Sequence, residues 1–293
     1  TQYTLIGGRD VAKAQSEHVT DMNKLTAREN DHEDFSLVKK PALTVMEMLA
    51  QLGTTRFPMP HLTPDTDGPG AIVTQHDDGT WAAVLYNSRD EIRVSGVDNI
   101  TLELPDTDGE WDVLVTSLND IDGTPFSVWE KAGVRLEPTL AQVKDPQGMG
   151  EAVRLGFPTV DELKQMRAAA EPHEKLRKKM TGGWTLNLDL PVPSVTLVIA
   201  RPASQGTPPA PVPTMYQTGG AAGEETIVSW PDLGEVGLCF EVGMKRDGEI
   251  RVLNPSPCLA NVYTVDGIGE IFVRSVSLGG KRGDWVAAKA KAA

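Results

Sequence analysis

Short segments in which apolar and polar residues alternate, each bounded by glycine, proline or aspartate, recur along this chain and constrain its fold most strongly. Because the side chains of a strand point alternately to the two faces of a sheet, such alternation predicts strands with one buried face. Glycine (28) and proline (21) together make up about a sixth of the 293 residues, above the usual share of about 12%. The sequence therefore predicts a mainly β protein with few long helices.

A first β-sandwich is predicted over residues 57–201. Residues 71–76 and 81–87 are joined by a hairpin signal, and 100–104 and 111–116 are predicted to extend the pair into an antiparallel meander. Two later strands are predicted to close the sandwich. The segment 185–190 alternates, whereas 194–200 is apolar throughout and is predicted to be buried on both faces.

A helical insertion interrupts this sandwich. Short helices are predicted at 125–133 and, from the capping box that Thr159 opens, at 159–170. The basic cluster 175–179 follows, where cations suit the C-terminal end of a helix. We expect it to be a solvated helix end; the alternative is contact with a sulfated glycan.

A proline-rich linker is predicted at 202–214, followed by a C-terminal β-sandwich at 215–293. The stiff, polar linker suits a domain boundary. The strands expected beyond it are 225–230, 237–245, 249–253, 259–265 and 270–276, at the spacing of a small sandwich.

Residues 1–56 have no core of their own. They contain a short possible strand at Tyr3 and a helix that Pro41 begins and Gly53 ends. Its apolar stripe is predicted from the spacing of four residues: Val45, Met46, Leu49 and Leu52. We expect a partner to cover this helix over 41–52. The start at Thr1, without an initiator methionine or signal peptide, suggests a processed, truncated or split protein.

Several function classes find no support in the sequence. A formal charge of −13 disfavours nucleic acid as a partner. No apolar run is long enough for a membrane span, and the five histidines and two cysteines have no metal-site spacing. No phosphate loop, dinucleotide fingerprint or nucleophile-elbow motif occurs, so we expect no cofactor, no metal and no recognisable catalytic constellation.

Two features concern the compartment. Cys239 and Cys258 are predicted to form a disulfide that closes a loop of about twenty residues, worth about 3 kcal/mol, in an oxidising compartment. The alternative is two buried thiols in a reducing cell. Asn99, in Asn99-Ile-Thr101, is a glycosylation candidate if the protein is secreted.

A group of ordered motifs resembles α-L-iduronidases, members of glycoside hydrolase family 39. The motifs are Leu25-Thr-Ala-Arg28, the stretch 39–53, Gly70-Ala-Ile-Val73 with 81–86, Phe126-Ser-Val-Trp129, the stretch 157–172 and 194–202. Similarity to iduronidases in particular rests on Met166-Arg-Ala-Ala-Ala-Glu-Pro172 and on a C-terminal region that resembles a fibronectin type III domain. The other motifs are shared with the β-xylosidases of the family. The resemblance implies a β-sandwich with a helical insertion, a fibronectin type III-like sandwich, and a remnant of a (β/α)8 barrel end at 1–56.

The resemblance also implies that the catalytic centre lies elsewhere. Family enzymes are retaining glycosidases with two glutamates on barrel strands. A complete barrel needs about 250 residues, and the sequence contains no Asn-Glu dipeptide of the kind that carries the family's acid/base. The residues matching the uronate-binding Asp and Arg of iduronidases are Arg9 and Asn23, and an Asn lacks the bidentate grip of a guanidinium on a carboxylate. Arg9, Asp10, His18 and Asn23 therefore remain candidates for a substrate rim.

Three hypotheses follow. The first is the C-terminal, non-catalytic portion or subunit of an iduronidase-like family 39 glycosidase, inactive alone, with a barrel-bearing N-terminal chain as partner. The second is a non-catalytic structural module that binds a glycan or a protein, and the third is a β-xylosidase-like relative. A secreted, lysosomal or other oxidising compartment is expected in the first case.

Overall fold

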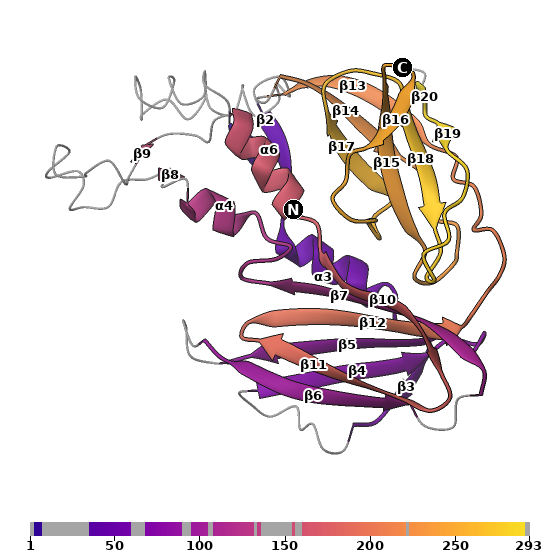
Figure 1. The fold of residues 1–293 in the computed structure, drawn as a ribbon. Coiled ribbons are helices and arrows are strands. Elements are labelled where there is room, and N and C mark those ends of the chain that lie inside the picture. The colour runs from indigo at the N-terminus through magenta and orange to yellow at the C-terminus, as the bar shows by residue number, and fades with distance from the viewer. Residues whose placement is uncertain are drawn as a thin grey trace, which may run out of the picture.

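The computed structural model describes residues 3–7, 35–59, 68–89, 95–104, 108–131, 134–135, 154–155, 160–220 and 223–290. Strands far outnumber helices in these residues, and they build two β-sandwiches with a small group of helices beside them (Figure 1). The predicted fold class, mainly β with two sandwiches, is confirmed.

The first sandwich packs a six-stranded sheet against a two-stranded sheet. The larger sheet has the order β10 (His173–Thr181), β7 (Glu110–Asn119), β12 (Ser194–Pro202), β5 (Trp81–Ser88), β4 (Gly68–Gln75) and β3 (Thr55–Phe57). The smaller pairs β11 (Trp184–Pro191) with β6 (Val97–Leu104). Val113 and Val198 of the larger sheet pack with Trp184 and Leu190 of β11 in the core between them.

The predicted meander is wrong at one step, because β6 and β7 belong to different sheets. Every second residue of β6 is exposed, as expected for an outer strand. By contrast, β7 is buried from Trp111 to Leu118 and lies between β10 and β12. Such a strand needs a neighbour on each side and cover on both faces, which a hairpin with β6 would not provide.

Strand β12 is buried on both faces, as predicted. Val198 and Ala200 face the core of the first sandwich. Leu197 and Ile199 face a second core that also contains Val276 and Leu278 of the C-terminal sandwich. This second core, which we call the shared core, joins the two sandwiches.

The C-terminal sandwich consists of two four-stranded sheets. One has the order β17 (Val262–Asp266), β14 (Gly223–Ser229), β13 (Thr214–Gly220) and β20 (Lys289–Ala290), and the other β16 (Glu249–Val252), β15 (Cys239–Arg246), β18 (Ile271–Val276) and β19 (Val286–Ala287). Trp230 and Phe240 lie in its core, with ring centroids 4.9 Å apart. The five strands predicted here are confirmed within three residues at their ends.

The remaining described elements, among them α3 (Pro41–Leu49), lie outside the sheets of the two sandwiches (Figure 1). The others are β1 (Tyr3–Gly7), β2 (Phe35–Lys39), α4 (Phe126–Lys131), β8 (Val134–Arg135), β9 (Arg154–Leu155) and α6 (Val160–Ala169). The three predicted helices are thus present. The strand predicted at Tyr3 is also present, and it pairs antiparallel with β2.

Val45, Leu49 and Leu52 pack against the shared core as predicted, and Met46 alone departs from the predicted stripe of α3. Met46 is 53% exposed, whereas Thr44 and Met48 are fully buried. Met48 lies in the shared core, and Val45 and Leu49 pack against it. The chain thus covers much of this stripe itself, and a partner that covers the helix over 41–52 stays a prediction. The spacing of one buried helix face is matched better by residues 44, 45, 48 and 49 than by the predicted stripe, which contained Met46.

Candidate functional site

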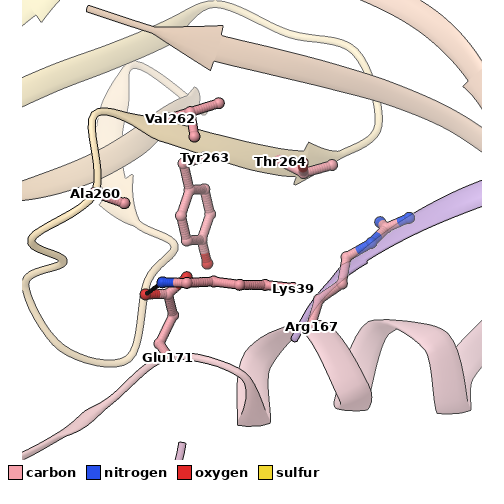
Figure 2. Close-up of a pocket in the computed structure, with 7 residues that line it drawn as sticks. All are labelled: Lys39, Arg167, Glu171, Ala260, Val262, Tyr263 and Thr264. Atoms are coloured by element: carbon pink, nitrogen blue, oxygen red, sulfur yellow. Dashed lines mark hydrogen bonds and ion pairs between the residues drawn. The ribbon is translucent and has the colours of Figure 1, made fainter. Parts of the chain in front are cut away.

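Buried charged residues meet where β2, α3 and α6 face the C-terminal sandwich (Figure 2). We call this place the charged junction. Lys39 at the end of β2 donates from Nζ to Glu47 Oε2 at 2.6 Å and to Glu171 Oε2 at 3.4 Å. The side chains of these three residues are only 9%, 17% and 9% exposed, respectively. The ammonium group of Lys39 is thus paired with two carboxylates in a site that is largely shielded from solvent.

A second group of charges lies beside the first. Arg167 on α6 reaches across to Glu225 on β14 and Asp266 on β17, and it forms an ion pair with each. Glu225 is buried, with 3% of its side chain exposed. Since the loss of one partner leaves a buried charge uncompensated, this pairing fixes α6 against the C-terminal sandwich.

Burial and neighbouring charges shift the pKa values in the junction. Burial raises the pKa of Glu47; Lys39 opposes this shift, and Glu171 adds to it. Burial alone would lower the pKa of Lys39, but Glu171 and Glu47 outweigh it, so that the pKa is raised. Burial, followed by the charge of Glu171, raises the pKa of Tyr263, whose hydroxyl points toward Lys39 and Glu171 in Figure 2. Lys39 therefore stays charged and Tyr263 neutral at any physiological pH.

The junction is not shaped for a sugar. The cavity between Lys39, Glu171 and Tyr263 measures about 40 Å³, whereas ligand pockets usually have about 300–1,000 Å³. Glu171 beside this cavity and Glu47 on α3 both pair with the same lysine, which differs from the two carboxylates that flank a glycosidic bond in a glycosidase. The arrangement suits a structural connection with room for a water molecule.

Two larger clefts open on either side of the junction. One, of about 470 Å³, lies between the α6 end and the C-terminal sandwich and is lined by Ile121, Pro172, His173 and Pro257, among others. The other, of about 450 Å³, lies between α3 and that sandwich, and Glu47, Asp232 and Glu235 contribute carboxylates to it. Among the described residues, no group of three or more His, Cys, Asp or Glu side chains is arranged to hold a metal ion.

The prediction that the basic cluster 175–179 is a helix end is wrong. These residues form the centre of strand β10. Most of its cations are paired: Lys175 with Asp122 at 2.7 Å, Arg177 with Glu174 at 2.8 Å and Lys179 with Glu110 at 3.1 Å. Because β10 is an edge strand, its charges protect an open hydrogen-bonding edge from pairing with other chains.

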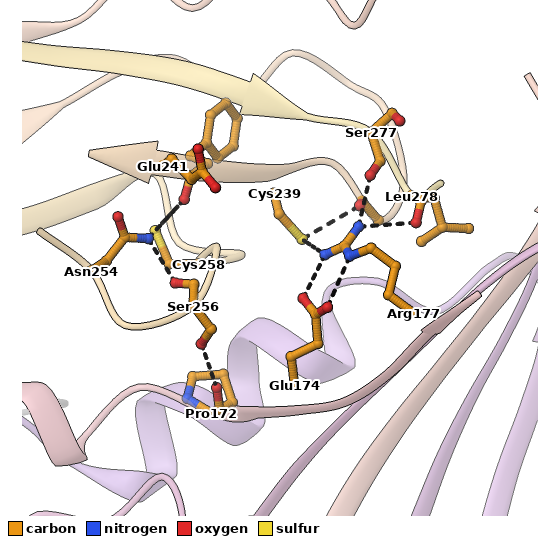
Figure 3. A network of polar contacts seen from close by, with 12 residues as sticks. Pro172, Glu174, Arg177, Cys239, Glu241, Asn254, Ser256, Cys258, Ser277 and Leu278 are labelled. Atoms are coloured by element: carbon orange, nitrogen blue, oxygen red, sulfur yellow. Dashed lines mark hydrogen bonds and ion pairs between the residues drawn. The ribbon is translucent and has the colours of Figure 1, made fainter. Parts of the chain in front are cut away.

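Arg177 also connects the two sandwiches (Figure 3). Its Nη1 donates to the carbonyl oxygens of Ser277 and Leu278 at 2.7 and 2.9 Å, and its Nη2 lies 3.6 Å from Cys239 Sγ. Ser256 Oγ adds a contact to the Pro172 carbonyl oxygen at 3.4 Å. The basic cluster thus serves domain contact through one of its members.

The predicted disulfide is absent, and both cysteines are free and buried. The strand register explains this. Cys258 pairs with Phe240, the neighbour of Cys239, so that the two sulfur atoms belong to opposite faces of the sheet. Cys239 lies in the shared core and Cys258 in the core of the C-terminal sandwich. Burial raises the pKa of both thiols, which makes them unreactive.

The substrate-rim candidates Arg9, Asp10, His18 and Asn23 all lie outside the described residues. Asn99 is exposed on β6, where its amide contacts Asp189 on β11. Thr101, the third residue of the sequon, donates to Asn187 Oδ1 at 2.9 Å on the same face. The glycosylation candidate is thus accessible from solvent.

Sequence reasoning missed the junction residues Lys39, Glu47, Arg167 and Glu171. Lys39 and Glu171 are 132 positions apart, and no local pattern connects them. A weak signal did exist, since Lys39 lies two residues before a helix that carries an acid at position 47. None of the described helices is long and apolar enough to cross a membrane.

Fold and site together define a protein of two coupled β-sandwiches, held by a shared core and a charged junction. No family model matches the sequence. α-L-Iduronidase of the dog, Canis lupus familiaris, is 28% identical to the chain over 278 residues, which cover 84% of this chain and 38% of the dog protein. A solved structure of the bacterial orthologue of human α-L-iduronidase matches with a TM-score of 0.75 and 24% identity, over 99% of this chain and 47% of that one.

The chain is therefore homologous to α-L-iduronidase, and its fold is that of part of the bacterial orthologue. It spans less than half the length of either relative. A monomeric β-xylosidase from Caulobacter crescentus and a family 39 glycoside hydrolase from Xanthomonas axonopodis pv. citri align less well. Each gives a TM-score of 0.40, at 13% and 14% identity respectively, over 57% of this chain and 31% of the other.

Proposed function

We propose that this chain is the C-terminal, non-catalytic portion of an iduronidase-like glycoside hydrolase of family 39, and that it works with a barrel-bearing polypeptide. The observation that carries the proposal is the unequal coverage: the match takes in 99% of this chain but 47% of the bacterial orthologue. The substrate class is the glycosidic bonds of a polysaccharide or glycosaminoglycan. The chain's own contribution is a rigid support, made of both sandwiches and the helices between them.

Two measurements test this proposal. The purified chain is expected to turn over neither an aryl α-L-iduronide nor an aryl β-D-xyloside, and native mass spectrometry of the protein from its source is expected to find a barrel-bearing polypeptide bound to it. Turnover by the chain alone, or a native sample without such a polypeptide, would overturn the proposal. The two aryl glycosides, applied to the complete assembly, separate an iduronidase from a β-xylosidase.

A secreted or lysosomal compartment is part of the same proposal. It depends on the relationship to iduronidase, because the two free cysteines give it no support. Glycosylation at Asn99 tests it. The expected result is a mass increase on the peptide that contains Asn99, removed by an amidase that cleaves N-glycans, while the exposed Asn187 on the next strand, which is in no sequon, stays unmodified. An unmodified Asn99 in protein from a eukaryotic source would count against it.

A further inference from the structure

Among the residues that the structure describes, carboxylates outnumber cations at the charged junction. Lys39 and Arg167 supply two positive charges, and the four carboxylates in contact with them are Glu47, Glu171, Glu225 and Asp266. Three of these four acids have less than a fifth of their side chain exposed. Buried charge of one sign in excess is costly, because it has lost its hydration without gaining a counter-charge.

The imbalance is concentrated around Lys39. Its Nζ lies 2.6 Å from Glu47 and 3.4 Å from Glu171, so both acids compete for one ammonium group.

Among the described residues that line the same cavity as Lys39, Arg167 is positively charged and is paired with Glu225 and Asp266. Strand β17 contributes the neutral Tyr263, and the loop before it contributes the buried thiol of Cys258. His173 and Glu174 line the cleft on the other side of Glu171. Across the neighbouring cleft lie two further acids, Asp232 and Glu235, of which Glu235 is paired with Arg201. One proton on Glu47 would leave Lys39 and Glu171 as a balanced ion pair.

Protons can reach Glu47. It has 17% of its side chain exposed and lines the cleft of about 450 Å³ between α3 and the C-terminal sandwich. We propose that acid stabilises the contact of β2, α3 and α6 with the C-terminal sandwich, because Glu47, which shares the single ammonium group of Lys39 with Glu171, takes up a proton as the pH falls. This inference does not depend on the proposed function.

The sign follows from the raised pKa of Glu47. A carboxyl group with a higher pKa in the folded than in the unfolded chain binds protons more tightly when folded. Its contribution to stability is complete below the unfolded pKa, and it is lost as the pH rises through the raised folded pKa. The contact is therefore stronger at about pH 5 than at about pH 8, and each additional proton bound by the folded chain changes the unfolding equilibrium constant about tenfold per pH unit.

Urea unfolding of the whole chain between about pH 5 and about pH 8 tests the proposal. The wild type is expected to lose stability as the pH rises. Glu47→Gln, which cannot ionise, is expected to show a smaller slope and to exceed the wild type at about pH 8. Glu270→Gln serves as the matched control. It removes the same charge from the chain as Glu47→Gln does, but from a side chain that is 68% exposed.

Lys39→Met gives the opposite change. Without the ammonium group, both acids are buried without a counter-charge, so the variant is expected to be destabilised more at about pH 8 than at about pH 5. Because the whole chain carries −13, acid also relieves general repulsion. The test is therefore the slope of unfolding free energy against pH, compared between variants. If the slope of Glu47→Gln equals those of the wild type and of Glu270→Gln, the proposal is overturned, whether or not Lys39→Met folds.

Discussion

Replacing Met48 by Ala tests whether the shared core holds the two sandwiches together. Met48 on α3 is completely buried, and its cluster contains Leu114 of the first sandwich and Leu278 of the C-terminal one. Removing a buried methionine side chain costs about 2–5 kcal/mol, from lost burial and from the cavity left behind. At about 3 kcal/mol, the unfolding equilibrium constant would rise by about two orders of magnitude.

The matched control is Met46→Ala, two residues earlier in the sequence but on the solvent side of the same helix. Met46 is 53% exposed, so this substitution is expected to change stability by no more than about 0.5 kcal/mol. Both substitutions have the same chemistry and the same small effect on helix propensity, and the difference between them isolates burial.

Urea unfolding followed by tryptophan fluorescence is the assay, since Trp111 and Trp184 report on the first sandwich and Trp230 on the second. The wild type is expected to unfold in one transition and Met48→Ala at lower urea, with the two sandwiches beginning to separate. If Met48→Ala costs no more than Met46→Ala, the shared core does not couple the sandwiches and the reasoning is wrong.

Two further predictions concern the two buried cysteines and the close approach of Gly279 to Asp112. Cys239 and Cys258 are expected to react with a thiol reagent only after unfolding, because both thiols are buried. A reductant is expected to leave the melting temperature unchanged. A lower melting temperature after reduction would show that the two cysteines do form a disulfide. Gly279→Ala is expected to destabilise the chain by about 1–3 kcal/mol, because its new Cβ would lie 2.6 Å from Asp112 Oδ2. Gly206→Ala, with its nearest neighbour at 3.4 Å, is the control and is expected to be close to neutral, so equal effects of the two substitutions would refute this account.

Local patterns predicted the parts of the fold that depend on neighbours in sequence. The hairpin of β4 and β5, the doubly buried β12 and helix α6 are all present, because alternation, apolar runs and helix-start signals act over a few residues. Strand β10 was missed, because its charges look like a helix end when the sheet edge that they protect is unknown.

Contacts between distant segments could not be read in this way. The partner of β6 is β11, more than eighty residues later, although β7 follows it directly. The disulfide prediction failed because it used spacing alone, whereas bonding depends on which face of the sheet each sulfur occupies. The charged junction combines residues from β2, α3 and the end of α6, so it exists only once the two sandwiches meet.

The proline-rich stretch 202–214 shows that composition alone does not tell whether two domains move independently of each other. Its residues suit a linker between separable domains, yet several of its backbone groups are bound. Ala203 N donates to Glu110 O at 2.8 Å, and Lys281 Nζ donates to Gln205 O at 2.8 Å. Ser275 Oγ donates to the Pro209 carbonyl oxygen. The segment is therefore bound to both sandwiches, which are also joined by the shared core and the charged junction. Relative motion of the two sandwiches must break the contacts of the segment, of the shared core and of the charged junction together.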